Sequence, residues 1–275
     1  MYARDFEYDG QSLSDYNCIV CDFDGSSGAL FASAGSSITF NKATRNFGRS
    51  NILTGIQYDE CFTATFDICK DPDNILSDEE MYFTSDEYRD LVRWLNRGSF
   101  NKFRILFEDY DIDVDTFYFN ASFNVEKIKI GEKVCGLRLT METDKPYAYG
   151  DEEISTFSVT TANFATSCLV KVVSDDIGDI YPVVHIVCKS AGDLKIINSA
   201  MGTITIIQDC VSGEEITIDG NILMVKTTSS KNIWSRFNYV FPQLTNSLNR
   251  RVNELKFSIP CEVTVSYVPI IKETV

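Results

Sequence analysis

The strictest constraint on this chain is the alternation of apolar and polar residues in VNELKFSIPCEVTVSY, residues 252–267. Every odd position from 255 to 267 is apolar, and most even positions are polar. Successive side chains of a β-strand point to opposite faces of a sheet, so this pattern predicts strands with one buried face. Pro260 has no N–H to give to a sheet, which predicts two strand segments separated by a bulge or an edge.

Similar alternation recurs along the chain, which is 44% hydrophobic and 12% aromatic. Short strands at close spacing are typical of β-sandwiches and barrels. We therefore expect a mainly β fold built of β-sandwich domains, with strand signals at 37–40, 61–69, 103–107, 117–130, 136–142, 181–189, 202–208 and 216–226.

One segment, TSDEYRDLVRWLNRG (84–98), predicts a helix instead. Thr84 and Glu87 form a capping box, and Gly98 is placed to stop the helix. Trp94 lies off the expected apolar stripe, so it is a candidate contact for another subunit or a partner; partial burial beside a loop is the alternative. The stripe itself comprises Tyr88, Leu91, Val92 and Leu95.

The segment ETDKPYAYGDEEIS (142–155) marks a domain boundary. A strand signal ends at Glu142, the turn 144–146 follows, and alternation resumes after Gly150. We expect two domains, 1–150 and 151–275, each large enough to bury its own core.

The net charge of −15 is concentrated in the first half, where residues 1–150 carry −11. The negative electrostatic potential that results repels the phosphate backbones of nucleic acids, so it disfavours specific nucleic-acid binding. Within it, EDYDIDVDTFYF (108–119) has an aspartate at every second position: Asp109, Asp111, Asp113 and Asp115. The run lacks the glycine and glutamate of a calcium loop, so a solvated acidic strand is favoured over an adventitious cation site or a catalytic cluster.

No catalytic, cofactor or metal motif is present. The single histidine, His185, lies among branched apolar residues without a nucleophile motif and fits a hydrogen-bonded structural role. In a strand Cys18 and Cys21 face opposite ways, so they cannot share a metal. The adjacent pairs 152–153 and 214–215 are expected to be solvated glutamates. The remaining candidates are aromatic residues able to stack on sugars: Trp94, Trp234 and Tyr239.

The chain has no apolar run near the roughly 18 residues that a membrane span needs, and MYARDFEYDG does not resemble a secretion signal. We expect no membrane insertion and synthesis inside the producing cell.

Several stretches in succession resemble the distal tail protein (Dit) family of long, non-contractile-tailed phages and prophages of Gram-positive bacteria. They are MYARDFEYDGQSLSDYNCIVCDFD, DEYRDLVRWLNRGSFNKFRILFED, GLRLTMETDKPYAYG, DLKIINSAMGTITI, GEEITIDG, FPQL and SIPCEVTVSYVPI. The resemblance implies a ring-forming N-terminal domain like the tail-tube fold, and a C-terminal galectin-like or carbohydrate-module-like β-sandwich.

The resemblance also implies a function without catalysis. Family members form a ring, generally a homo-hexamer, between the tail tube protein and the tail-associated protein at the tip, and they hold receptor-binding or baseplate proteins. Six acidic domains would line a DNA channel, with 109–115 as a candidate lumen or solvent face. The resemblance marks Tyr2, Phe6 and Tyr8 as structural residues and candidate interface contacts, and Pro146, Tyr147 and Tyr149 as a candidate domain junction. We therefore expect a virion component that is assembled in the cytoplasm of the infected bacterium. The alternative is a carbohydrate-binding β-sandwich module or an adhesin that contacts the host surface.

Overall fold

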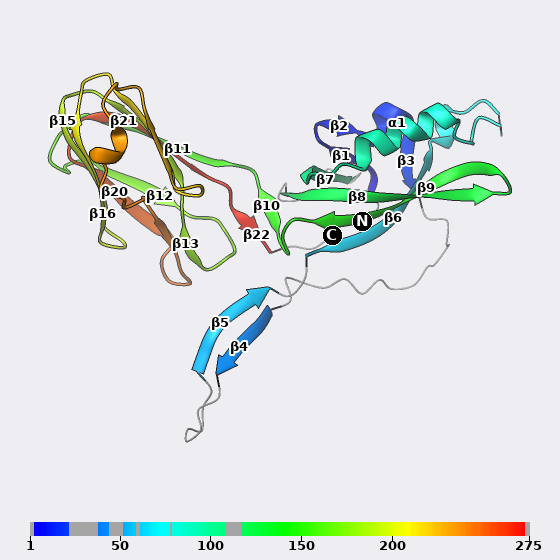
Figure 1. The fold of residues 1–275 in the computed structure, drawn as a ribbon, viewed down its shortest axis with the longest axis horizontal. Coiled ribbons are helices and arrows are strands. Elements are labelled where there is room, and N and C mark those ends of the chain that lie inside the picture. Colours follow the sequence, from blue (N-terminus) through cyan, green and yellow to red (C-terminus); the bar gives the residue numbers. More distant parts are fainter. Residues whose placement is uncertain are drawn as a thin grey trace. The chain divides into compact units, whose positions relative to one another are not determined.

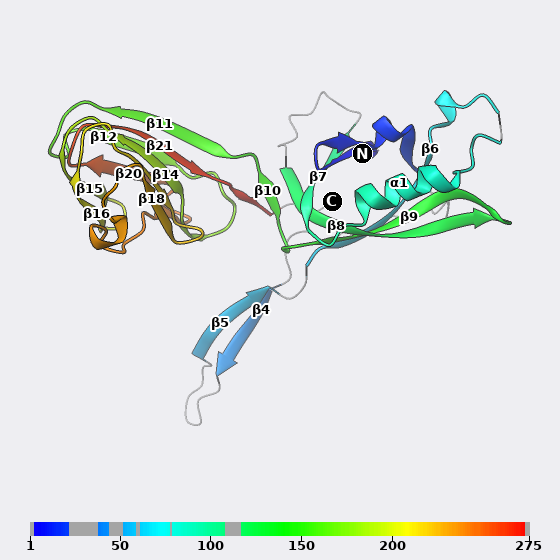
Figure 2. The same cartoon turned by 45° about the horizontal axis from the view of Figure 1, so that its top comes forward.

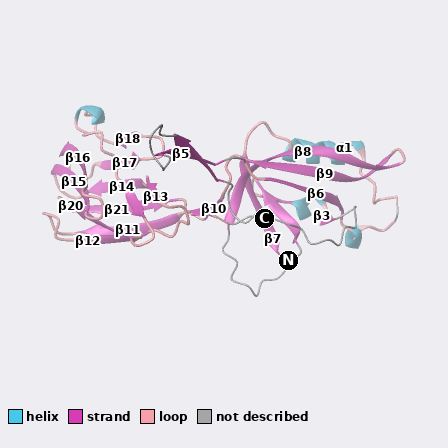
Figure 3. Cartoon of the chain, turned by 90° about the horizontal axis from the view of Figure 1, so that it is seen from below, coloured by secondary structure: helices cyan, strands magenta, loops and turns pink. Residues whose placement is uncertain are grey.

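The computed structural model describes residues 3–21, 38–43, 52–58, 61–77, 79–107 and 117–272. By its internal contacts the chain divides into two compact units, residues 1–150 with 271–275 and residues 151–270 (Figure 1). Most described residues lie in strands (Figure 3), as the alternation predicts. Among the described residues no helix is both long and apolar enough to cross a membrane.

The N-terminal unit is built on one sheet with the strand order β2-β1-β7-β8-β9-β6-β3. Its strands are β1 (Ala3–Tyr8), β2 (Gln11–Ser12), β3 (Cys18–Cys21), β6 (Thr63–Lys70), β7 (Asn101–Phe107), β8 (Phe117–Ile130) and β9 (Lys133–Thr143). β10 (Ala148–Gly150) pairs with β8 and with β22 (Ile270–Ile271), while β4 (Ile38–Ala43) and β5 (Ile52–Tyr58) form a separate hairpin. Two short 3-10 helices are η1 (Leu13–Tyr16) and η2 (Pro72–Asn74).

This sheet must curl strongly, because strands far apart in its order touch. β1 and β6 are four places apart, which in a flat sheet would separate them by roughly 19 Å. Yet the ring centroids of Phe6 on β1 and Phe66 on β6 are 5.7 Å apart. The curl brings aromatic rings from several strands into one core with Phe103 and Phe123.

The one α-helix among the described residues, α1 (Ser85–Leu95), packs on this core (Figure 2). The predicted capping box is confirmed: Thr84 accepts from the Glu87 N–H, and the Glu87 carboxylate accepts from the Thr84 N–H at 2.7 Å. The predicted stop at Gly98 is wrong, because Asn96 is already the C-cap. Tertiary bonds fix this end, since the Asn96 side chain donates to the Phe123 carbonyl at 2.8 Å.

The C-terminal unit is a β-sandwich of two antiparallel sheets. One has the order β11-β21-β14-β17-β18 and the other β12-β20-β15-β16, while β13 and β19 form a third, two-stranded ladder. The bounds are β11 (Glu153–Val159), β12 (Ser167–Lys171), β13 (Gly178–Ile180), β14 (Val183–Cys188), β15 (Gly192–Asn198), β16 (Thr203–Cys210), β17 (Glu215–Asp219), β18 (Met224–Thr227), η3 (Ile233–Ser235), β19 (Leu244–Asn246), β20 (Val252–Phe257) and β21 (Cys261–Tyr267).

The alternating segment 252–267 serves both sheets. As predicted, it forms two strands that are interrupted at Pro260, and the odd positions from 255 to 267 are all buried. β20 lies inside the four-stranded sheet and β21 inside the five-stranded sheet, so the chain crosses between the layers at residues 258–260. The Pro260 carbonyl still accepts from the Lys189 N–H at 2.9 Å.

Candidate functional site

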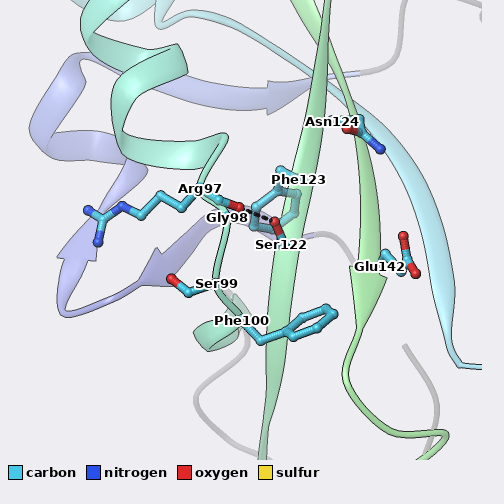
Figure 4. Close-up of a pocket in the computed structure, with 8 residues that line it drawn as sticks. All are labelled: Arg97, Gly98, Ser99, Phe100, Ser122, Phe123, Asn124 and Glu142. Atoms are coloured by element: carbon cyan, nitrogen blue, oxygen red, sulfur yellow. Dashed lines mark hydrogen bonds between the residues drawn. The ribbon is translucent and has the colours of Figure 1, made fainter.

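A pocket lies where α1 ends, and we call it the helix-end pocket. It has a volume of about 230 Å³ and is lined by Arg97, Gly98, Ser99, Phe100, Ser122, Phe123, Asn124 and Glu142 (Figure 4). The Ser122 hydroxyl donates to the Arg97 carbonyl at 2.8 Å, which ties the helix end to β8. Phe100 is 47% exposed and gives the pocket an apolar surface that the fold leaves uncovered.

A second, wider pocket of about 370 Å³ lies on the other side of the helix end, lined by Gln11, Tyr16, Asp90, Arg93, Trp94 and Arg97. Arg97 therefore lines both pockets. Its guanidinium contacts the Asp9 carboxylate and its Nε donates to the Trp94 carbonyl at 2.9 Å, which holds this half-buried side chain in place. Arg93 lies 3.6 Å from Asp90, and this pair is solvent-exposed and contributes little to stability.

Three of the predicted interface residues lie inside the N-terminal core. Phe6, Tyr8 and Trp94 are 1%, 0% and 3% exposed. The Trp94 indole stacks on the rings of Phe6 and Tyr16 and donates to the Tyr8 carbonyl at 3.0 Å. Their assignment as contact residues is corrected to packing residues, because a partner cannot reach side chains without accessible atoms.

The correction for Trp94 has a simple cause. The buried face of α1 comprises Leu91, Trp94 and Leu95, so the apolar stripe is rotated toward Trp94 relative to the predicted one. Tyr2 and the run Asp109, Asp111, Asp113 and Asp115 lie outside the described residues.

The predicted junction residues all belong to the N-terminal unit and lie just before the division at Gly150. The Tyr149 ring packs on Tyr118 of β8, with centroids 5.6 Å apart, and its hydroxyl donates to Asp144 at 3.2 Å. Burial, followed by the charge of Asp144, raises the pKa of Tyr149 well above its usual value. Tyr147 contacts the Tyr149 ring edge-on, and Pro146 precedes it in the same turn.

The C-terminal unit exposes an aromatic patch around Trp234 and Tyr239. Their rings are stacked with centroids 5.9 Å apart, and they are 38% and 64% exposed. The Tyr239 hydroxyl donates to the Trp234 carbonyl at 3.0 Å, and the Tyr239 backbone takes a positive φ of 61°. A non-glycine residue holds this strained conformation only where its surroundings impose it, so the pair is presented in a fixed arrangement.

Two buried polar residues of the C-terminal unit form an ion pair that the sequence does not reveal. Glu214, expected to be solvated, is 2% exposed, and it accepts from Arg236 at 2.6 Å. Burial alone would raise the pKa of Glu214, but hydrogen bonds from Arg236, Thr227 and the Val211 N–H hold it below its usual value. The residues are 22 positions apart, and nothing in the pattern of either segment signals the pairing.

The single histidine lies in the C-terminal unit on β14. The Nδ1 atom of His185 lies 3.2 Å from the Thr217 hydroxyl, which fits the predicted structural role. Within the part of the chain that the structure describes, no group of three or more His, Cys, Asp or Glu residues is arranged to hold a metal ion.

Comparison with protein-family models gives two matches in succession. Residues 1–145 match a family described as "Phage tail protein N-terminal domain", and residues 147–267 match one described as "Phage tail C-terminal domain". The chain belongs to this family of phage tail proteins. No match was found among curated proteins.

The fold of this phage tail protein is similar to that of the Dit protein (gp 19.1) of phage SPP1. The TM-score is 0.63 at 17% sequence identity, and the match covers 97% of this chain and 99% of the other. That crystal structure is described as a paradigm of the hub adsorption apparatus in phages infecting Gram-positive bacteria. The similarity establishes that both units together have a Dit-like, β-sandwich-based fold.

Proposed function

We propose that this phage tail protein is a hub: a subunit that forms a ring at the distal end of the tail tube and joins it to the tail tip. One observation carries the proposal. The similarity to SPP1 Dit extends over 97% of this chain and 99% of that one, so it includes both units in order and not a single widespread β-sandwich. A common sandwich alone would say little about function.

The proposed partners follow from this role. Copies of the chain assemble into a ring, which we propose to be a hexamer; one face meets the tail tube protein and the other meets the tail-associated protein. Receptor-binding or baseplate proteins attach around it. The net charge of −11 in residues 1–150 supports a channel through which DNA passes without binding. Assembly takes place in the infected cytoplasm, and the role requires no catalysis or cofactor.

The proposed junction at Pro146, Tyr147 and Tyr149 suits a hub, since each unit then faces its own partners. The hydrogen bond from Tyr149 to Asp144 and its packing on Tyr118 anchor the last strand of the N-terminal unit before the chain enters the sandwich.

The experiment that tests the ring is the mass of the purified chain in solution, measured by light scattering over a concentration series with negative-stain images of the same samples. A species near six subunits with a central hole is the expected result. The chain is also mixed with the tail tube and tail-associated proteins from the same phage genome. If it stays monomeric at every concentration, both alone and in these mixtures, the hub proposal is wrong.

The exposed Trp234–Tyr239 patch favours a second candidate for the C-terminal unit, namely carbohydrate binding at the host surface. Aromatic rings with a free face stack on sugars, and this pair is held in place. Titration with host cell-wall saccharides, followed by isothermal calorimetry, tests it with Trp234→Ala as the control. A saturable change that disappears in the variant supports sugar binding, and no change excludes these saccharides as ligands.

A further inference from the structure

The N-terminal unit has a leucine side chain that is almost fully exposed to solvent. Leu76, in the loop between β6 and α1, is 95% exposed. The loop around it is fixed by its own hydrogen bonds: the Leu76 N–H donates to the Glu80 carboxylate at 3.0 Å. Before it, Asp71 accepts from the Asp73 N–H at 3.0 Å and from the Asn74 side chain at 2.9 Å. Leu76 is therefore held outward without burying any apolar surface in its own subunit.

The helix-end pocket lies at the other end of the same helix. The Leu76 loop precedes the N-terminus of α1, and Arg97 to Phe100 follow its C-terminus, so the two features occupy opposite ends of the element (Figure 2). The volume of about 230 Å³ exceeds the roughly 150 Å³ of a cavity that holds a benzene ring, so a leucine side chain fits within it. Phe100 supplies the apolar surface that such a side chain would cover.

The charges of the two ends are complementary. From residue 71 to residue 88 the sequence has seven acidic residues and no basic residue, and one of the seven, Glu87, is already paired with Lys70 at 2.7 Å. From residue 89 to residue 104 it has five basic residues and one acidic residue. At the basic end Arg97 lines both pockets and Arg93 lines the wider one. Glu142 lines the helix-end pocket opposite Arg97 and repels carboxylates, so the acidic loop of the other copy would approach from the side of the two arginines.

We propose that Leu76 of one subunit inserts into the helix-end pocket of the next copy, with the acidic loop against Arg93 and Arg97. The contact joins two different surfaces of the same chain, so it is heterologous, and repeating it around an axis produces a ring. The inference rests on the proposed hub function and names the side chains that hold its ring together.

Cross-linking of mixed variants tests the contact without requiring a closed ring. Ser77→Cys protein and Ser99→Cys protein, which keep Leu76 and Phe100 in place, are purified separately, mixed at high concentration and treated with a short thiol-specific cross-linker. We expect a cross-linked dimer in the mixture and none above the wild-type background, set by the native cysteines, in either variant alone. Peptide mapping should identify the cross-link between positions 77 and 99. A mixture without this dimer overturns the proposal.

A substitution without added thiols gives an independent measure. Leu76→Ser should raise the concentration at which half of the protein is assembled at least tenfold, because the pocket loses its apolar occupant. Leu76→Met, which keeps the apolar volume, should restore assembly. Ile130→Ser is the matched control, since Ile130 is also exposed, at 63%, in the same unit but outside the contact; it should assemble as the wild type does.

The outcomes separate this contact from the hub function. Wild-type rings that survive Leu76→Ser unchanged would overturn the contact and leave the hub proposal intact. A specific cross-link between positions 77 and 99 from a chain that never forms rings, alone or with partners, would support the contact and contradict the hub.

Discussion

The buried pair Glu214–Arg236 shows how one residue can determine the stability of the C-terminal unit. The side chains are 0% and 6% exposed, and the carboxylate also accepts from the Thr227 hydroxyl and the Val211 N–H. Removing one partner of such a pair leaves the other charge buried and uncompensated. Neither partner shows this in the sequence, where Glu214 sits beside Glu215 as one of two apparently equivalent charges.

We expect Glu214→Gln to lower the free energy of unfolding of the C-terminal unit by about 3–5 kcal/mol at pH 7. Urea denaturation monitored by Trp234 fluorescence measures it, and Glu215→Gln, at an exposed neighbour, should change stability by less than about 0.5 kcal/mol. Equal losses of unfolding free energy in the two variants would show that the buried ion pair stabilises the unit no more than an exposed carboxylate does.

The same pair predicts a pH dependence. The pKa of Glu214 is lowered in the folded state, so its contribution is present above the unfolded-state pKa and is lost as the pH falls through the folded-state value. The difference in unfolding free energy between the wild type and Glu214→Gln should therefore shrink below about pH 4. Chemical denaturation at several pH values between neutral and acid checks this, and a difference that grows in acid would contradict it.

The two tryptophans offer a matched comparison at the same scale. Trp94 is 3% exposed and Trp234 is 38% exposed. Trp94→Ala should cost about 3–5 kcal/mol of unfolding free energy in the N-terminal unit, whereas Trp234→Ala should cost much less in the C-terminal unit. Thermal and urea denaturation of both variants measure this. A much smaller loss of unfolding free energy in Trp94→Ala would contradict the assignment of Trp94 to the N-terminal core.

At the scale of elements, the sequence predicts what local chemistry controls. The capping box of α1 depends on Thr84 and Glu87 alone, and the burial pattern of 252–267 depends only on the period of two; both are confirmed. The end of α1 depends on Ser122 and Asn96 bonding across to other segments, and the rotation of its buried face depends on the ring of Phe6. Such distant contacts leave no local signal, so the sequence misplaces the helix end at Gly98, assigns Trp94 to the surface and gives no sign of the helix-end pocket.

Thr84→Ala should lower the unfolding free energy of the N-terminal unit by about 1 kcal/mol, because the Glu87 N–H loses its acceptor. Ser85→Ala, one position further and exposed, is the control and should have little effect. The shift in thermal midpoint measures both. No difference between the variants would mean that the start of α1 is fixed by packing alone.

At the scale of the whole molecule, two separate cores support the division of the chain. Each unit has its own cluster of buried apolar residues. Hydrogen bonds tie the last residue of the C-terminal unit, Ile270, to its loop 174–175: its N–H donates to the Ser174 hydroxyl at 3.1 Å and its carbonyl accepts from the Asp175 N–H at 2.8 Å. Sequence alternation indicates that such cores exist, but not which strands pair, because period two is the same in every sheet order.

A fragment of residues 151–270 should therefore fold by itself, since it contains every strand of both sandwich sheets. We expect a cooperative urea transition and dispersed amide resonances from the isolated fragment. A fragment that remains unfolded in buffer would show that the sandwich needs the N-terminal unit.

The crossing of the chain at Pro260 has a consequence for synthesis. β20 separates β12 from β15 in one sheet, and β21 separates β11 from β14 in the other, so each layer is missing an interior strand until residues 252–267 have left the ribosome. The earlier strands can form hairpins during translation but cannot close the sandwich. A nascent chain that stalls before this segment therefore leaves both layers split.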